Sequence, residues 1–150
     1  MKTAVVTGAA QGVGLATSKL LAQQGYHVVM TDVQPLETQE AALTAQGLAV
    51  SSMSGDVSSE AFTADLAARL LAQHGGADVL VNNAGISLIC PAEETSLDQW
   101  QRVMSINLAG PFLLCRALGQ QMLQKGEGSI INVASIAGLH GVIHRAAYNA

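Results

Sequence analysis

The stretch that decides the fold runs from Val5 to Gly14 and reads VVTGAAQGVG. The apolar run Ala4 to Val6 predicts a buried strand that ends at Thr7. Helix-forming residues from Val13 to Gln24, with few breakers, predict a helix directly after it. A glycine-rich turn between a strand and a helix is the context in which a glycine pattern indicates phosphate binding.

Each glycine of this turn has a physical task. Gly8 can adopt the positive φ of a tight turn, Gly12 lets the backbone approach a diphosphate, and Gly14 removes a Cβ where helix and strand pack closely. The first N–H groups of the helix would face the phosphate. The candidate cofactor-binding residues here are Gly8, Gln11, Gly12, Val13 and Gly14. The spacing is Gly-x3-Gly-x-Gly rather than the common Gly-x-Gly-x2-Gly, and a chance triplet among 15 glycines is the alternative.

The composition suits an α/β protein whose strands are covered on both faces. Hydrophobic residues make up 49% of the 150 residues and charged residues 12%, and the mean hydropathy is +0.32. Apolar surface buried in an oligomer would fit the same values. The net charge of −4 without a Lys/Arg cluster argues against nucleic acid and anionic membranes as partners. No apolar run reaches the length of about 18 residues that a membrane span needs.

Neither a signal peptide nor a metal site is expected. Lys2 is followed at once by the first strand, with no cleavage region. We therefore expect a cytoplasmic protein. The four histidines lack a carboxylate at metal-ligand spacing and are interpreted as structural; they are His27, His74, His140 and His144.

Strand and helix patterns alternate along the whole chain, so we expect one dinucleotide-binding domain over residues 1–150. Further strands are expected at 26–31, 48–52, 78–82 and 129–134. Helices are expected from Pro35 to about Gln46, from a cap at Ser58 or Ser59 to Gly75, and from a capping box at 95–98 to about residue 125. The third of these helices should break or kink at Gly110-Pro111. Strands separated by helices imply parallel pairing through right-handed crossovers, and hence a doubly wound parallel sheet.

Asp32 is the candidate for recognising the adenosine ribose. It follows the second strand, 20 residues after Gly12, where a carboxylate can accept hydrogen bonds from both ribose hydroxyls. The same charge would repel the 2′-phosphate of NADP, and no Arg or Lys lies at 9–13 or 33–37 to offset it. NAD is therefore favoured over NADP. The alternative is a surface aspartate that caps the next turn.

Two further strand ends carry candidate cofactor contacts. Asp56 follows the third strand, where it could accept a hydrogen bond from the adenine amine beside the apolar wall of Val57. Asn82 and Asn83, with Ala84 and Gly85, end the fourth strand and could tie neighbouring strands together and bring backbone close to a ribose. Ordinary turn formation is the alternative at both places.

Ser135, Tyr148 and Asn107 are the candidate catalytic residues. Ser135 ends the fifth strand and Tyr148 comes 13 residues later. Both can reach the carboxyl ends of the strands, where open α/β sheets bind ligands. Their two hydroxyls could converge on a carbonyl oxygen as an acid/base pair. Asn107 interrupts a helical pattern, which suits either an exposed position or a polar task.

Taken together, these motifs resemble the short-chain dehydrogenase/reductase family over nearly the whole chain. The loop from Thr7 to Gly14 looks like its Thr-Gly-x3-Gly-x-Gly motif, and Tyr148-Asn149-Ala150 like the start of its Tyr-x3-Lys signature. The resemblance implies a Rossmann-like sheet of order 3-2-1-4-5 and NAD(P)-dependent hydride transfer between an alcohol and a ketone. It also implies Tyr148 as general acid/base, Ser135 polarising the substrate oxygen, and Asn107 in a proton relay. Homodimers or homotetramers are the expected assembly.

The family's lysine would fall four residues after Tyr148, beyond Ala150. We therefore expect a domain truncated at its C-terminus, and a 150-residue chain that is inactive by itself. There are two alternatives to a fragment of an alcohol/ketone oxidoreductase: a non-catalytic dinucleotide-binding or assembly module, and a sugar epimerase of the extended family. The epimerase would require a different glycine spacing.

Overall fold

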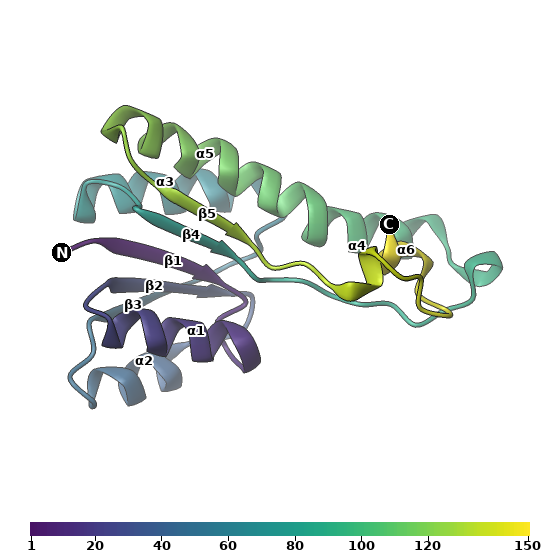
Figure 1. Ribbon diagram of the computed structural model, residues 1–150, viewed down its shortest axis with the longest axis horizontal. Coiled ribbons are helices and arrows are strands. Elements are labelled where there is room, and N and C mark those ends of the chain that lie inside the picture. The colour runs from purple at the N-terminus through teal and green to yellow at the C-terminus, as the bar shows by residue number, and fades with distance from the viewer.

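Five parallel strands form one sheet in the order β3-β2-β1-β4-β5. The computed structural model describes residues 1–150. The strands are β1 (Thr3–Thr7), β2 (His27–Asp32), β3 (Val50–Ser54), β4 (Val79–Asn82) and β5 (Ser129–Asn132). The predicted Rossmann-like doubly wound sheet and its strand order are confirmed (Figure 1).

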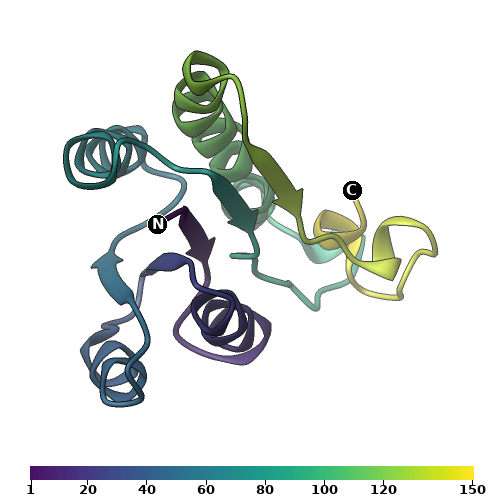
Figure 2. The same ribbon diagram turned by 60° about the vertical axis from the view of Figure 1, so that its left-hand side comes forward.

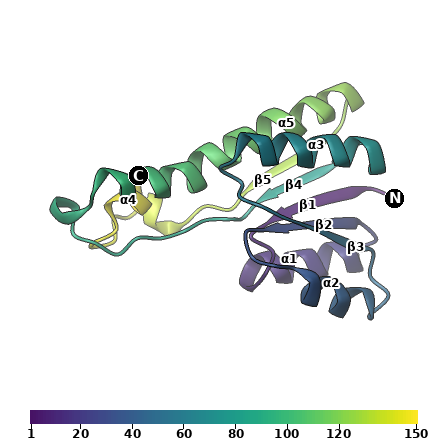
Figure 3. The same ribbon diagram turned by 180° about the vertical axis from the view of Figure 1, so that it is seen from behind.

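Helices cover both faces of the sheet. Figures 1 and 2 show α1 (Gly12–Gln23) and α2 (Glu37–Thr44) on one face, and α3 (Glu60–His74) and α5 (Gly110–Lys125) on the other. Three smaller elements extend past the carboxyl ends of the strands (Figure 3): α4 (Leu97–Met104), the 3-10 turn η3 (Ile136–Gly138) and α6 (Ala146–Asn149). None of the helices combines the length and apolar character that crossing a membrane requires.

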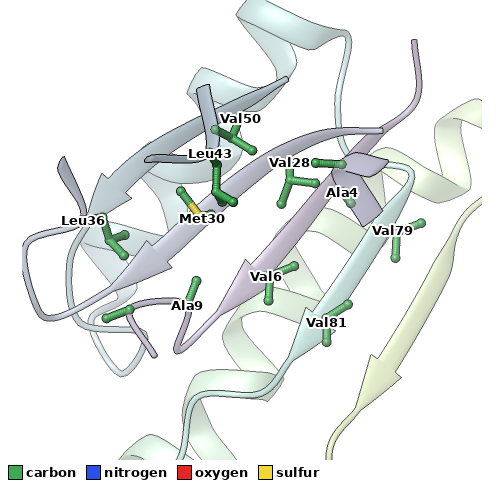
Figure 4. Close-up of a cluster of buried hydrophobic side chains, with 12 residues drawn as sticks. Ala4, Val6, Ala9, Val28, Met30, Leu36, Leu43, Val50, Val79 and Val81 are labelled. Atoms are coloured by element: carbon green, nitrogen blue, oxygen red, sulfur yellow. The ribbon is translucent and has the colours of Figure 1, made fainter. Parts of the chain in front are cut away.

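Alternating side chains of the central strands belong to two separate hydrophobic cores, one on each face of the sheet. Ala4 and Val6 of β1 face one core, and Val5 between them faces the other, because successive side chains of a strand point to opposite faces. The first core lies under α1 and α2 and includes Met30, Leu36 and Leu43 (Figure 4). The second lies under α3 and α5. The sheet is thus buried on both faces around β1, as parallel sheets require.

Several predicted boundaries are wrong by a few residues. The helix expected from Pro35 begins at Glu37 instead, because Leu36 is fully buried in the first core and its φ and ψ lie outside the helix. The third strand runs over 50–54 rather than 48–52. Pairing with β2 decides its position, since Val28 opposes Val50, and an edge strand with little apolar pattern carries no such signal.

Helix caps explain two of the remaining boundaries. Ser59 caps α3, with its side chain accepting from the N–H of Phe62. The predicted capping box at 95–98 is displaced by one residue, because the reciprocal pair is Ser96 and Gln99. An aspartate at position 98 is too short for this role, whereas the longer glutamine reaches back to the backbone N–H of the cap.

In place of the break or kink predicted at Gly110-Pro111, the structure has a wide helical turn just before these residues. Residues Ser105–Ala109 form a π-helical turn (η2) between α4 and α5, in which the N–H of Gly110 donates to the carbonyl of Ser105. Pro111 has no N–H to donate to the carbonyl of Asn107, four residues earlier. The helical path therefore continues, with its hydrogen bonding rearranged around Asn107.

β5 lies at one edge of the sheet with β4 as its single neighbour. Ile131 is 48% exposed, and every residue of the strand is exposed. Within residues 1–150, β5 therefore has one unpaired edge and incompletely covered faces.

Two histidines stack at the amino-terminal edge of the sheet. The rings of His27 and His74 lie 4.4 Å apart between centroids, and Nε2 of His27 is 2.9 Å from the hydroxyl of Ser51. Burial lowers the pKa of His27, and the positive charge that His74 can carry lowers it further, against an opposing effect of Glu40. The structure contains no group of three or more His, Cys, Asp or Glu side chains arranged to hold a metal ion.

Shortening a core side chain of α5 should destabilise the fold. Leu118 is 0% exposed in the second core, whereas Leu123 on the same helix is 84% exposed. We expect Leu118→Ala to lower the free energy of unfolding by about 2–5 kcal/mol, through lost burial and the cavity left behind. Leu123→Ala should change it by less than about 0.5 kcal/mol. Urea denaturation measures both, and equal losses would contradict the assignment of the core.

The histidine pair should make stability depend on pH. Because the pKa of His27 is lowered in the folded state, the unfolded chain binds a proton there more readily. The neutral side chain of His27 therefore makes its full contribution to stability above about pH 6.5, and this contribution is lost as the pH falls through the pKa of His27 in the folded state. We expect His27→Gln to lose less stability than the wild type on acidification from about pH 7.5 to 5.5. The exposed His140→Gln variant is the control, and equal losses in wild type and His27→Gln would exclude this effect.

Candidate functional site

The turn between β1 and α1 presents a row of unpaired backbone donors. Gly8 and Gly12 have φ of +65° and +56°. No acceptor in the chain receives the N–H groups of residues 11–14, and Gln11, at the N-cap of α1, makes no side-chain cap. With the positive end of the helix dipole behind them, these donors suit an anion such as a phosphate.

Gly14 allows α1 to approach this turn closely. A Cβ at this position would overlap the carbonyl of Gly8 and lie 2.6 Å from Nδ2 of Asn83. Only a residue without a side chain can therefore occupy position 14 without moving the turn.

The hydroxyl of Thr7 joins the carboxyl ends of β1 and β4. It accepts hydrogen bonds from the backbone N–H groups of Asn83 (3.0 Å) and Ala84 (2.9 Å), and lies 3.4 Å from the carbonyl oxygen of Val81. Thr7 was not among the site residues identified from the sequence. The available signal was a polar residue at the end of an otherwise apolar strand.

The two asparagines that end β4 bond to different neighbours. Nδ2 of Asn83 donates to the carbonyls of Thr7 (2.9 Å) and Gly8 (3.2 Å), so this side chain holds the turn between β1 and α1. Nδ2 of Asn82 donates to Oδ1 of Asn132 on β5 at 2.8 Å. Three adjacent strands are therefore linked at their carboxyl ends through side-chain amides.

Asp32 lies beside the turn, and the backbone holds its carboxylate in place. Oδ2 accepts from the N–H of Ala10 and Oδ1 from the N–H of Gln34, both at 3.0 Å. A carboxylate has about four acceptor positions, so each oxygen keeps capacity for a further donor. The half-exposed side chain can thus position the turn and still accept hydrogen bonds from a ligand.

The carboxylate of Asp56 bonds to Ser58, just before α3, and to Arg102 on α4. Oδ1 accepts from the backbone N–H (2.9 Å) and hydroxyl (2.6 Å) of Ser58, and Oδ2 from Arg102 (3.1 Å). The hydrogen bond from the Ser58 hydroxyl lowers the pKa of Asp56, the bonds from the Ser58 backbone and from Arg102 add to this, and burial opposes it. Val57 is 5% exposed and packs where Gly110 has no side chain. The adenine contacts of Asp56 and Val57 stay predictions.

Asn107, in the π-helical turn, clamps the loop that follows β4. Its Oδ1 accepts from the N–H of Ile86 and its Nδ2 donates to the carbonyl of the same residue, both at 2.9 Å. A Cβ on Gly85 would lie 3.4 Å from Oδ1 of Asn107. This two-point contact fixes the path of the chain from the end of β4 towards α4.

Ser135 and Tyr148 lie on neighbouring elements beyond the end of β5. Ser135 caps η3, with its hydroxyl oxygen accepting from the N–H of Ala137 at 3.1 Å. Tyr148 is half-buried on α6, which packs against η3 and α4. The side chain of Asn149 donates to the carbonyl of Val142 (2.9 Å) and accepts from its N–H (3.3 Å), closing the loop between the two elements.

The sequence-predicted residues therefore gather at one end of the sheet. Those after β1, β2 and β4 are linked by direct hydrogen bonds, whereas Asp56 contacts Ser58 and Arg102 instead. Ser135 precedes η3 and Tyr148 lies on α6. Figure 1 shows α4 and α6 beyond the carboxyl ends of the strands. Sequence reasoning missed Gln39, which contacts the turn between β1 and α1, and Arg102, which contacts Asp56.

Comparison with known proteins agrees with this arrangement. The family model described as short chain dehydrogenase matches residues 2–150. The D-threitol dehydrogenase of Mycolicibacterium smegmatis is 38% identical over 149 residues, which cover 98% of this chain and 57% of that protein. The chain thus spans little more than half the length of this curated relative.

Solved structures of the same fold superpose closely. A metagenomic short-chain oxidoreductase in complex with NADP has a TM-score of 0.92 and 39% identity, over 98% of this chain and 68% of that chain. An NAD+-bound xylitol dehydrogenase has a TM-score of 0.93 and 35% identity, over 98% and 58% of the two chains. The family match along nearly every residue, with the glycine turn and the linked strand ends, shows that this chain belongs to the short-chain dehydrogenase/reductase family.

Proposed function

We propose that the protein is an NAD-dependent oxidoreductase that transfers a hydride between a secondary alcohol or ketone and the nicotinamide. The observation that carries this proposal is the row of unpaired N–H groups at residues 11–14. They belong to the turn between β1 and α1, in which Gly8 and Gly12 have positive φ. Relatives named as dehydrogenases support the reaction class. Neighbouring structures that contain NADP or NAD+ support the class of cofactor.

The residues of the site fit a dinucleotide. Unpaired donors at the start of α1 suit a diphosphate, and Asp32 has free acceptor positions for ribose hydroxyls. Asn83, Ala84 and Gly85 border the same turn, and we assign them to the nicotinamide-side ribose. Asp56 and Val57 are assigned to the adenine end. When bound, the nicotinamide supplies or accepts the hydride.

NAD is proposed over NADP because of the charge at the ribose position. Asp32 places a carboxylate beside the turn, and none of the ion pairs of the chain involves it. A 2′-phosphate there would meet like charge. One structural neighbour contains NADP and another contains NAD+. Membership of the family therefore does not select the cofactor, and the preference that we propose rests on Asp32.

The hydrogen-bonding state of each side chain supports the catalytic roles that we propose. The hydroxyl oxygen of Ser135 accepts from Ala137, which leaves its own proton free to donate to a substrate carbonyl oxygen. The hydroxyl of Tyr148 has no hydrogen-bond partner within the chain, so it is available to give or take the substrate proton. Asn107, engaged with Ile86, would hold the rearranged helical turn from which a proton relay can start.

The substrate is proposed to be a small molecule bound between the loop after β4 and the segment after β5. Both segments expose apolar side chains there, among them Ile89, Ile136 and Ile143. Relatives named for threitol and xylitol make polyols the first compounds to assay. The complete protein is proposed to act as a homodimer or homotetramer, with the exposed Phe112 on α5 in a partner surface.

Cofactor preference is tested by titrating the full-length protein with NADH and NADPH. We expect tighter binding of NADH by about tenfold or more, because each unit of like charge near Asp32 costs about 1 kcal/mol even in water. Asp32→Ser should reduce this preference, and Asp65→Ser, on the outer face of α3, should keep it. Tighter NADPH binding by the wild type would contradict the role of Asp32.

The acid/base assignment is tested with the two tyrosines of the chain. Tyr148→Phe should lower kcat for a polyol or other secondary alcohol by about 10²-fold or more, because a positioned proton donor is lost, and NADH affinity should stay within about twofold. Tyr26→Phe is the matched control and should keep kcat. Ser135→Ala should also lower kcat. Wild-type protein that binds NADH but turns over no alcohol or ketone would favour a non-catalytic binding module.

A further inference from the structure

We propose that Gln39, on α2, is a positioning residue for the phosphate turn, by which we mean the turn between β1 and α1. By holding the carbonyl of Ala10, it directs the N–H of Gln11 towards the dinucleotide. This inference rests on the dinucleotide site of the proposed function. It concerns a side chain that lies 29 residues from the turn in the sequence and that approaches it from a different helix.

The contact between Gln39 and the turn is specific in its direction. Nε2 of Gln39 donates to the carbonyl oxygen of Ala10 at 2.9 Å. Oε1 of the same amide is shielded from solvent and has no hydrogen-bond partner. Turning the amide over would place two acceptor oxygens face to face, so the donor must be the group that faces Ala10.

A second set of contacts holds the turn from the side of β2. Oδ2 of Asp32 accepts from the N–H of Ala10 at 3.0 Å, and the carbonyl of Thr31 accepts from the N–H of Ala9 at 3.1 Å. Ala10 is therefore held at its N–H by Asp32 and at its carbonyl by Gln39. These two bonds fix the planes of two consecutive peptide groups.

The geometry of a trans peptide carries this restraint to the ligand side. In a planar trans peptide the carbonyl and the following N–H point in opposite directions, and the chain contains no cis peptide. With the carbonyl of Ala10 drawn towards α2, the N–H of Gln11 points away from α2. Gln11 is exposed and this N–H has no acceptor in the chain.

A purely structural role accounts poorly for the contact. Burying an amide oxygen without a partner destabilises a fold, and this offsets what the Nε2 bond contributes. The turn itself is flanked by Gly8 and Gly12, whose backbone freedom would let the Ala10–Gln11 peptide rotate. The hydrogen bond from Gln39 to that peptide therefore affects the N–H groups proposed to bind the phosphate more than it affects the core.

The test compares two glutamines of the same region in the full-length protein. Gln39→Met keeps the length of the side chain but removes its donor. Gln46→Met is the matched control, since Nε2 of Gln46 also donates to a backbone carbonyl, that of Ala42 at 2.8 Å, but on an exposed surface. We expect Gln39→Met to raise the KM for NAD by about five- to tenfold, the worth of one hydrogen bond. Its kcat, its KM for the alcohol and every constant of Gln46→Met should stay within about twofold.

Hydrogen exchange of the unliganded protein separates this inference from the proposed function. The amides of Ala9 and Ala10 should exchange about fivefold faster in Gln39→Met than in the wild type, with those of Val5 and Leu80 unchanged. If this occurs in a protein that binds no NADH, the restraint on the turn stands and the dinucleotide function fails. If NADH binds but the KM for NAD of Gln39→Met matches that of Gln46→Met, the positioning role is overturned, whatever the exchange rates.

Discussion

The buried hydroxyl of Thr7 is the contact on which the functional end of the sheet depends. β1 is the central strand, with β2 on one side and β4 on the other, so the chain must diverge where β1 and β4 end. Two N–H groups at that point, those of Asn83 and Ala84, have left the strand ladder, and the Thr7 hydroxyl accepts from both. The Asn83 amide returns hydrogen bonds to the carbonyls of Thr7 and Gly8. The two strands thus diverge without leaving these backbone N–H groups unpaired.

The two ends of the sheet use their polar groups in opposite ways. At the amino-terminal edge, Asp78 accepts from the backbone N–H of Thr3 (2.7 Å) and pairs with Lys125 at the end of α5. Burial acts to raise the pKa of Asp78, but the bonds from Lys125 and Thr3 outweigh it and the pKa is lowered. Charge there is neutralised within the chain. At the carboxyl-terminal edge, the N–H groups of residues 11–14 find no such partner. Polar groups are therefore paired within the chain at the amino-terminal edge, whereas the carboxyl-terminal edge keeps unpaired donors that suit an anion.

Sequence patterns predicted the order of the elements, because strands buried on both faces give apolar runs that polar residues and glycines end. Most strand boundaries were placed within one or two residues of those observed. These patterns were least accurate where tertiary contacts determine the start or the register of an element. The start of α2 depends on the burial of Leu36, and the register of β3 on its pairing with β2. An irregularity of the helix near Pro111 was predicted from the sequence, but a π-helical turn was not. A π-helical turn (η2) keeps the helical path and presents the Asn107 amide to Ile86, which a propensity for breaking helices does not reveal.

By itself, the sequence determined the alternation of strands and helices, the glycine turn after the first strand, and the polar residues that follow each strand. These features depend on neighbours within a few residues and on simple periodicity. Only the tertiary structure decided that Thr7 meets Asn83, that Arg102 meets Asp56, and that Gln39 holds Ala10. The members of these pairs lie 76, 46 and 29 residues apart. A hydrogen bond over such a separation leaves no local pattern, because any polar residue at either position would fit the same periodicity, and only the packing of the sheet and its helices brings the two together.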